Sequence, residues 1–579
     1  MEKHESLASL PAQWQPLLQN ESADVLAALQ RAWQALFQQP MQAAQTAEAL
    51  FHQLNTNQPA TWLAFAIALC ARIQTLSNFC SLDSLLSAYE NERQQLDLPP
   101  AILSELDVFY FGALVFRNPG HPNIATLSQQ VLDTFEQEGS PLLRLTAANY
   151  LLLYRIWKGD LLGADALGAR VLALRETAED TRTNLLSHSI MAMLKRLFLE
   201  YKASHNEIAA GLALSEQTGL HYWDSHFHMQ AAFLALTKGN LDEANEWLNA
   251  MEQSAPPEHY LDRSGYHYSR TWQYILADEA ERALRHAQEA VHLAELSGAI
   301  FPQAVTHLGL AQLYLEKRKL GRAIFHISHA RKVGKAMDSH YVPFARGLAR
   351  AHIAQKLGMS KRCELILAST FKLGREQHYL NYPWWRGDIM AKLCAQALAA
   401  NIEPEYTKML IQKRRLQPPK GETKHWHWPL VVHILDGGTI TLDDQPVVLN
   451  GKIRELFFSL AALGNADLPI SRNTLQDQLW PDSQGDLAKQ ALDTSIHRLR
   501  KLLGTENLIL SLPNGLMLNP NMVRVDYWDL LIELGKAKHN DAEIQTLLHF
   551  LQQLNQDDNS WQLPKDSLIR RISHKVLLR

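Results

Sequence analysis

The stretch from residue 486 to 503 combines an apolar stripe with polar side chains of the kinds that contact DNA. At 100° per residue, its apolar positions fall within about 60° of one another on a helix. These positions are Leu492, Ile496, Leu499 and Leu503. The opposite face carries Gln490, Thr494, His497, Arg498 and Lys501. Arg498 suits a bidentate contact with guanine, Gln490 a contact with adenine, and Lys501 a phosphate. Because any amphipathic helix has a polar outer face, this pattern alone favours a solvated surface.

The segments around this helix predict a small α+β unit. The predicted strands are 430–435, 439–442 and 447–449, the predicted helices 451–463, 471–480 and 486–503, and the predicted hairpin strands 508–511 and 516–518. The first three strands form an antiparallel sheet, and Ser471 is the expected N-cap of the second helix. The turn Pro513-Asn514-Gly515 between apolar runs is a strong hairpin signal. Strands, three helices and a hairpin, in this order, make a winged helix-turn-helix.

The local sequence strengthens this interpretation. The segments Leu475 to Asp482, Ala491-Leu492 and Ile496 to Gly504 closely resemble the OmpR/PhoB-type winged helix, in the variety carried by bacterial activators of the SARP and BTAD families. The resemblance covers residues 429–526 with a few residues beyond. It implies that the helix bearing Arg-Leu-Arg-x-x-Leu-Gly enters the major groove of promoter DNA. It also implies that the loop before this helix contacts RNA polymerase. The loop residues are Pro481, Asp482, Ser483 and Gln484.

The sequence departs from this family in its charge. The wing has Gly515-Leu516 where the family usually has Gly-Tyr, and the turn carries no Arg or Lys. Residues 426–579 hold 15 Lys plus Arg against 18 Asp plus Glu, a net charge of −3. The local positive patch must therefore come from Arg454, Arg472, Arg498, Arg500 and Lys501. The wing residue Asn514 is a further expected DNA contact. We expect one copy to bind DNA with modest affinity and a shallow salt dependence, and two copies to bind it tightly.

Residues 527–579 are expected to form a short helical tail, whose segment 567–572 is amphipathic.

The chain before residue 412 reads as successive helices. A turn, two or three polar residues and a small residue on a new helix recur, and the small residues are Ala164, Ala244, Ala283, Ala323 and Cys363, with a degenerate copy near Asn206-Glu207-Ile208. Subtracting positions gives 39 residues from Ala244 to Ala283 and 40 at each of the next two steps. A small residue lets paired helices approach closely, and stacked pairs form a superhelix. The pattern resembles the long tetratricopeptide-like repeats in sensor arms of MalT-type bacterial regulators, over residues 140–400. The expected domains are a repeat array over 1–411, a linker over 412–428, and the winged helix over 429–526.

Aromatic and histidine residues also recur near the start of several helices of the array. The candidate ligand groove comprises Tyr222, Trp223, Tyr266, Phe301, Tyr341 and Tyr382. Concave surfaces of helical arrays often bind partners. Ordinary packing between neighbouring repeats is the alternative, and the pattern alone favours it. No metal site is expected, because His-Glu-x-x-His is absent and the histidines do not pair at helical spacing.

The sequence lacks the features that an enzyme, a membrane protein or a secreted protein needs. No phosphate-binding loop exists, since the Gly-Lys pairs at 334, 451 and 535 are followed by Ala, Ile and Ala. No nucleophile motif is present, and no cofactor is expected. Four cysteines never form Cys-x-x-Cys, and no apolar run approaches the ~18 residues of a membrane span. The N-terminus has no signal-peptide pattern, so a cytoplasmic protein is expected.

The sequence therefore predicts a mainly α protein, with a tetratricopeptide-like α-solenoid followed by a C-terminal α+β winged helix. The predicted function is that of a one-component transcription regulator, whose array binds a small-molecule, peptide or protein signal. It binds double-stranded promoter DNA, contacts RNA polymerase, and acts as a homodimer on DNA. The alternative is a protein-interaction scaffold whose winged helix binds protein instead of DNA.

Overall fold

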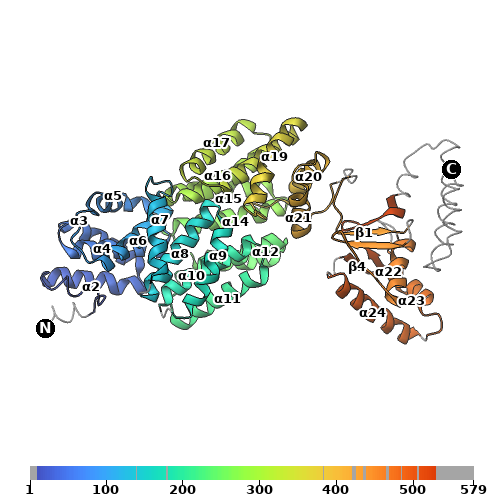
Figure 1. The fold of residues 1–579 in the computed structure, drawn as a ribbon, viewed down its shortest axis with the longest axis horizontal. Coiled ribbons are helices and arrows are strands. Elements are labelled where there is room, and N and C mark those ends of the chain that lie inside the picture. The colour runs from blue at the N-terminus through green and yellow to red at the C-terminus, as the bar shows by residue number, and fades with distance from the viewer. Residues whose placement is uncertain are drawn as a thin grey trace. The chain divides into compact units, whose positions relative to one another are not determined.

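The computed structural model describes most of the chain, in two compact units (Figure 1). The described residues are 9–137, 140–177, 180–382, 384–419, 425–434, 438–464, 469–483, 485–504 and 508–529. The first unit comprises Met1–Ile389 and Ala400–Thr407, and the second comprises Met390–Ala399 and the chain from Lys408 onward. Gln484 and the predicted tail from residue 530, with its amphipathic segment 567–572, lie outside the described residues.

Paired antiparallel helices build the first unit. Six consecutive pairs lie in the described chain: α8 (Pro141–Lys158) with α9 (Leu161–Arg175), α10 (Thr181–Leu197) with α11 (Tyr201–Thr218), α12 (Asp224–Lys238) with α13 (Leu241–Ser254), α14 (Tyr260–Leu276) with α15 (Ala280–Ser297), α16 (Ile300–Glu316) with α17 (Leu320–Ala336), and α18 (Tyr341–Lys356) with α19 (Ser360–Glu376). Before them come α2 (Ala23–Gln38), α3 (Pro40–Gln53), α4 (Pro59–Thr75), the 3₁₀ helix η1 (Phe79–Leu82), α5 (Asp83–Glu92), α6 (Pro100–Arg117) and α7 (Ile124–Glu136). After them come α20 (Gly387–Ala399) and α21 (Pro404–Arg414), most of whose residues belong to the second unit. None of the described helices is long and apolar enough to cross a membrane.

A small buried residue sits four positions after the N-cap of each second helix. These residues are Ala164, Ser204, Ala244, Ala283, Ala323 and Cys363, and each has an exposed fraction of 0%. The predicted repeat spacing is therefore confirmed, and the degenerate copy is corrected from residues 206–208 to Ser204. A polar residue is tolerated there because the Ser204 hydroxyl donates to the carbonyl oxygen of Ala192, in the partner helix, at 2.9 Å.

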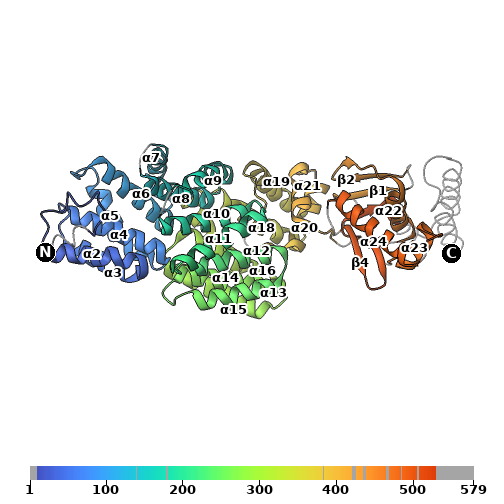
Figure 2. The ribbon, with the colours of Figure 1, turned by 90° about the horizontal axis from the view of Figure 1, so that it is seen from below.

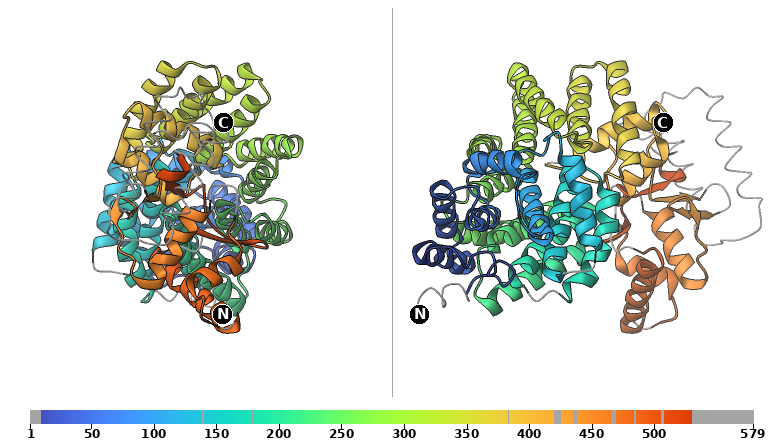
Figure 3. Two further views of the ribbon diagram at one scale, coloured as in Figure 1. Left: turned by 90° about the vertical axis from the view of Figure 1, so that its right-hand side faces the viewer. Right: turned by 60° about the vertical axis from the view of Figure 1, so that its left-hand side comes forward.

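The array bends back so that late repeats contact early ones. The backbone N–H of Leu261 donates to the Leu76 carbonyl at 3.1 Å, and Arg117 Nη1 donates to the Gly298 carbonyl at 3.4 Å. Figures 2 and 3 show green and yellow helices of the later repeats against the blue and cyan helices of the earlier ones. The closure is tight at Gly159, whose φ is +97°, because an added Cβ would lie 2.2 Å from the Tyr379 hydroxyl oxygen.

The second unit contains a mixed sheet. Its strands are β1 (Leu430–His433), β2 (Thr439–Leu442), β3 (Gln445–Pro446) and β6 (Val523–Val525), in the order β3-β2-β1-β6. β1 pairs antiparallel with β2 and parallel with β6. Two expectations are corrected here. The third strand is 445–446 instead of 447–449, where Val448 is 79% exposed, and the purely antiparallel sheet gains a parallel strand from a segment about 90 residues further along the chain.

Three helices and a hairpin complete the second unit. They are α22 (Gly451–Leu463), α23 (Arg472–Leu479), α24 (Gly485–Leu502), β4 (Ile509–Leu512) and β5 (Gly515–Leu518). The predicted helices match within one or two residues. The Ser471 hydroxyl accepts a hydrogen bond from the Thr474 N–H at 3.0 Å, which confirms the predicted N-cap. The predicted apolar stripe of α24 is buried in the core that all three helices share.

Candidate functional site

The outer face of α24 presents the polar side chains that the sequence places there. Gln490, Thr494, His497, Arg498 and Lys501 are exposed, while Leu492 and Leu499 on the other face are fully buried. Within the described part of the chain, His497, Arg498 and Lys501 make no side-chain hydrogen bond or ion pair. The buried stripe fixes the rotation of the helix. These donors are therefore held on a rigid element and remain available to a partner.

Two other predicted DNA contacts have partners inside the unit. Arg500 is half-buried and donates through Nη2 to the Ile509 carbonyl oxygen at 2.8 Å and to the Ser511 hydroxyl at 3.1 Å. It therefore joins α24 to β4. The guanidinium of Arg472, at the start of α23, forms an ion pair with Asp493 on α24. The structure thus separates the eight predicted contacts into free side chains and side chains that hold elements together.

The remaining predicted residues of this unit lie in turns. Asn514 is exposed between β4 and β5. Pro481, Asp482 and Ser483 are exposed in the turn between α23 and α24, and Gln484 is outside the described residues. Exposed apolar side chains also lie on α24, since Leu487 is 63% exposed and Leu502 is 57% exposed.

A cavity of about 220 Å³ lies within the closed repeat array. Side chains from the first helices of successive pairs line it, together with the segment after α19. Its aromatic lining comprises Phe116, Trp157, Trp223, Phe233, Tyr268, Trp272, Phe301, Tyr341, Tyr382 and Trp384. Four of the six predicted groove residues, namely Trp223, Phe301, Tyr341 and Tyr382, are therefore brought together. We call this space the central cavity.

Tyr222 and Tyr266 do not line the central cavity. The Tyr222 side chain packs against the core of the earlier helices, and burial raises its pKa well above the usual range. The Tyr266 hydroxyl accepts a hydrogen bond from Arg270 Nε at 3.1 Å, and the two side chains lie on the same helix. The recurring aromatic pattern therefore supplies both cavity lining and packing between helices.

The predicted groove list lacks six of the aromatic lining residues, namely Phe116, Trp157, Phe233, Tyr268, Trp272 and Trp384. The rings of Trp157 and Phe301 stack with centroids 5.1 Å apart, and Phe301 in turn contacts Tyr341 at 6.2 Å. The 40-residue spacing of Phe301 and Tyr341 predicts the second contact. No local signal predicts the first, because Trp157 and Phe301 meet only where the array closes.

Few charged or polar groups line the central cavity. Arg196 Nε donates to Gln230 Oε1 at 3.2 Å, and its guanidinium lies 4.9 Å from the centroid of the Phe233 ring. Desolvation lowers the pKa of Arg196. Asp262 is 1% exposed, and its Oδ2 accepts a hydrogen bond from the Ser225 hydroxyl at 2.5 Å. Burial lowers the pKa of His226. The negative charge of Asp262 acts to raise this pKa, and the positive charge of Arg196 acts to lower it further.

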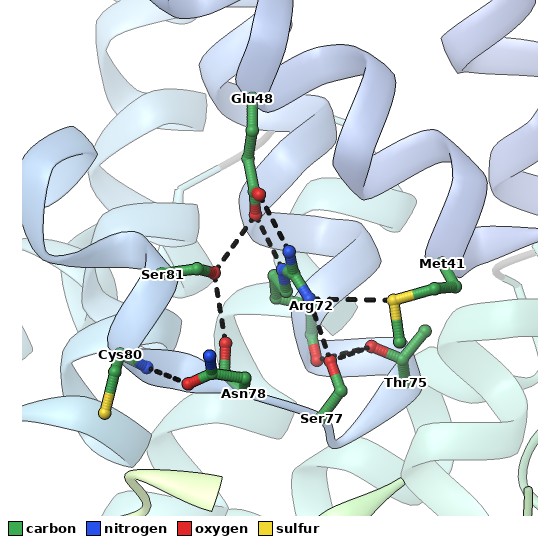
Figure 4. Close-up of polar contacts among 8 residues, drawn as sticks. All are labelled: Met41, Glu48, Arg72, Thr75, Ser77, Asn78, Cys80 and Ser81. Atoms are coloured by element: carbon green, nitrogen blue, oxygen red, sulfur yellow. Dashed lines mark hydrogen bonds and ion pairs between the residues drawn. The ribbon is translucent and has the colours of Figure 1, made fainter. Parts of the chain in front are cut away.

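A buried ion pair anchors one wall of the central cavity (Figure 4). Arg72 binds both carboxylate oxygens of Glu48, at 2.6 and 2.7 Å, and donates to the Ser77 hydroxyl at 3.2 Å. The Ser81 hydroxyl donates to the same carboxylate at 3.2 Å. These bonds hold the turn after α4, in which Leu76 has a φ of +46° and lines the cavity.

A second cavity, of about 530 Å³, lies among the helices from α2 to α10. Glu105 is one of its few charged side chains and accepts a hydrogen bond from Trp14 Nε1 at 3.1 Å. Burial raises the pKa of Glu105, and it raises the pKa of Cys70 to about 11. Trp223 and Leu186 line both cavities, so the two spaces share a wall.

No protein-family model matches this chain, and no curated protein matches it. Among solved structures, the chain is similar to a Rap protein in complex with Competence and Sporulation Factor. The identity is 11% and the TM-score 0.47, over 61% of this chain and 97% of that one. A second similar structure is the human IFIT1 dimer with m7Gppp-AAAA. Here the identity is 15% and the TM-score 0.35, over 72% of this chain and 94% of that one. At these levels neither match says what the chain binds.

Proposed function

We propose that this chain is a non-enzymatic, one-component regulator of transcription. In this proposal the repeat array receives a signal, and the C-terminal unit binds promoter DNA as an OmpR/PhoB-type winged helix. The observation that carries the proposal is the outer face of α24. Arg498, His497 and Lys501 are exposed there without partners in the described chain, on a helix whose other face is packed in the core.

Five polar residues of α24 then have distinct roles. Arg498 makes a bidentate contact with guanine, Gln490 contacts adenine, and Lys501 binds phosphate. Arg500 positions the hairpin, since both of its hydrogen bonds join α24 to β4. Asp493 lies on the same exposed side and opposes DNA phosphates, so two copies on the DNA supply the affinity that one copy lacks. Pro481, Asp482 and Ser483 form the surface offered to RNA polymerase.

The test is capture of genomic DNA fragments by the purified full-length protein at two salt concentrations. The variant Arg498→Ala/Lys501→Ala is compared with Lys452→Ala/Arg524→Ala. Each double variant removes two positive charges from the same unit, but Lys452 and Arg524 pair with Glu455 and Asp529 outside α24. We expect a few promoters to be enriched with the wild type and the control, and lost with the α24 variant. Equal loss in both variants, or no enrichment at either salt, contradicts the proposal.

The second candidate function is a protein-interaction scaffold. The exposed apolar side chains of Leu487 and Leu502 on α24 favour it, as does the excess of acidic residues in the unit. Under this alternative, Leu487→Ser/Leu502→Ser abolishes capture of a protein partner, and Arg498→Ala/Lys501→Ala does not. A DNA-binding α24 gives the opposite ranking in the fragment capture.

A further inference from the structure

We propose that the central cavity binds a free aromatic α-amino acid, with its carboxylate on Arg196, its ammonium group on Asp262 and its ring among the aromatic side chains. The inference rests on the proposed function in one respect: it gives the chemical class of the signal that the repeat array receives. Three features of the cavity carry it, namely an unpaired cation, a buried anion and the size and chemistry of the walls.

Arg196 is the cation. Its guanidinium has five N–H donors, of which Nε–H is used by Gln230. No carboxylate among the described residues pairs with it. Two other arginines of this array have carboxylate partners. Arg72 binds both oxygens of Glu48, and Arg175 binds Glu207 at 2.7 Å. A guanidinium held over an aromatic ring, with donors facing a cavity, is a receptor for a planar carboxylate.

Asp262 is the anion. It is 1% exposed and lines the cavity, and its Oδ2 accepts a hydrogen bond from the Ser225 hydroxyl. Among the residues that the structure describes, Oδ1 has no hydrogen-bond partner. The imidazole Nδ1 of His259, which carries a charge only when protonated, lies 3.7 Å from Oδ2. A buried carboxylate is costly unless it is paired and fully hydrogen-bonded. An ammonium donor from a ligand supplies the missing partner.

The cavity walls select the rest of the ligand. A cavity of roughly 150 Å³ lined by apolar side chains holds benzene, so about 220 Å³ has room for one aromatic ring with a short polar substituent. Trp223, Phe233 and Tyr268 are among the aromatic side chains that line this space, and aromatic rings favour contact with another aromatic ring. An apolar guest would leave both charges uncompensated, and an aromatic amino acid satisfies both while it fills the space.

Binding at this place also affects the closure of the array. Arg196 comes from α10 and Asp262 from α14, whereas Phe301 and Tyr341 reach the cavity from α16 and α18. A ligand held by all four helices binds the closed arrangement of the array more tightly than an opened one. It therefore shifts the equilibrium toward the closed arrangement, by the difference between its two affinities.

The test is isothermal titration calorimetry of the full-length protein with L-tryptophan, L-phenylalanine and L-tyrosine. Tryptamine lacks the carboxylate, indole-3-propionate lacks the ammonium group, and L-leucine lacks the ring. We expect at least one aromatic amino acid to bind, and each comparator to bind about ten-fold more weakly or worse, because each loses a charge-assisted hydrogen bond or the ring contacts. No binding of any aromatic amino acid overturns the inference, and so does equal binding of the comparators. These comparisons use the wild type and do not depend on whether a variant folds.

Two variants then assign the charges. Arg196→Met removes the preference for tryptophan over tryptamine, and Asp262→Asn removes the preference over indole-3-propionate. Arg282→Met is the control, since Arg282 is exposed on α15 and pairs with Glu279. Unchanged preferences in Arg196→Met and Asp262→Asn contradict the assignment.

The genomic fragment capture, run on the same preparation, separates this inference from the proposed function. Promoter enrichment without amino-acid binding refutes only the ligand. If an aromatic amino acid binds, but no promoter is enriched either with or without that amino acid in the capture, only the DNA-binding role is refuted.

Discussion

The phenolic hydroxyl of Tyr379 donates a 2.7 Å hydrogen bond to the carbonyl oxygen of Gly159, across 220 positions of the chain. The two preceding carbonyls are bound from the same distant region. The His340 N–H donates to Lys158 at 2.7 Å, and the Ser339 hydroxyl donates to Trp157 at 3.3 Å. The last carbonyls of a helix have no partner within it. The C-terminus of α8 is therefore capped by later repeats, and this cap joins the two ends of the closed array.

Replacement of Tyr379 by Phe tests this cap. We expect the free energy of unfolding to fall by about 1–3 kcal/mol, since a buried acceptor loses its donor. We also expect faster hydrogen exchange at the His340 amide, which belongs to the same cap. Tyr406→Phe is the matched control, because the Tyr406 hydroxyl donates to the nearby Tyr379 carbonyl at 2.6 Å. Equal exchange at His340 in both variants would show that Tyr379 does not hold the closure.

The small residue of each repeat gives a second prediction. Ala283→Leu places a larger side chain where the exposed fraction is 0% and helices α14 and α15 meet. Overpacking of this kind typically costs about 1–3 kcal/mol. The measurement is urea unfolding followed by circular dichroism. Ala280→Leu, at an exposed position of the same helix, is expected to change stability by less than about 0.5 kcal/mol. Equal effects at the two positions would contradict the close-approach explanation.

The ion pair between Arg472 and Asp493 gives a prediction for the DNA-binding proposal. Asp493→Ala removes a negative charge from the exposed side of α24 and frees the Arg472 guanidinium. We therefore expect tighter DNA binding and a salt slope that is steeper by about one phosphate contact. Glu455→Ala, which frees Lys452 on α22, serves as the control. Weaker binding of Asp493→Ala, measured by fluorescence anisotropy across a salt series, would mean that the pair is needed to orient α23 and α24.

A histidine recurs at one position in four consecutive first helices, and it contacts the residue nineteen positions later in the second helix. The pairs are His188 with Glu207, His228 with Trp247, His267 with His286, and His307 with His326. In the third pair the two Nδ1 atoms are 2.9 Å apart, so one ring donates and the other accepts. Two charged rings cannot share this hydrogen bond.

This arrangement predicts a loss of stability on acidification. Burial, with His286 and the nearby Arg263 and Arg270, lowers the pKa of His267 to about 4. An unfolded histidine has a pKa of about 6.5, so the unfolded chain binds more protons between about pH 6.5 and pH 4. Stability is therefore full above pH 6.5 and falls as the pH drops through this window, by about 1.4 kcal/mol for each unit of depression.

The measurement compares urea unfolding at pH 7 and pH 4.5 for the wild type and His267→Gln/His286→Gln. The variant is expected to lose less stability between the two pH values, since carboxylates titrate in both proteins and cancel in the comparison. His205→Gln, at an exposed position of α11, is the control. The same pH dependence in all three proteins would exclude the histidine pair as the cause.

Local sequence was enough to predict the bounds of the helices α22, α23 and α24, the repeat spacing and the buried stripe of α24, but not the bounds of the helices before residue 140. Ala283, Ala323 and Cys363 recur because each repeat needs the same close approach, and this requirement is met within one helical pair. Ser471 caps α23 and the Leu492 stripe faces the core because both depend on neighbours within a few positions. The same periodicity places Arg498 and Lys501 on the outer face.

Tertiary structure alone decided which of these groups have partners. Arg500 and Arg472 look like Arg498 in the sequence, yet they bind β4 and Asp493, because the hairpin and α23 pack against α24. Trp157 reaches Phe301, and Arg196 shares a cavity with Asp262, only because small rotations between repeats accumulate until the array meets itself. The sequence by itself determined each repeat. The rotations between successive repeats add up over the whole array, and this sum determines where the array closes and which side chains line the cavity. No single repeat contains that information.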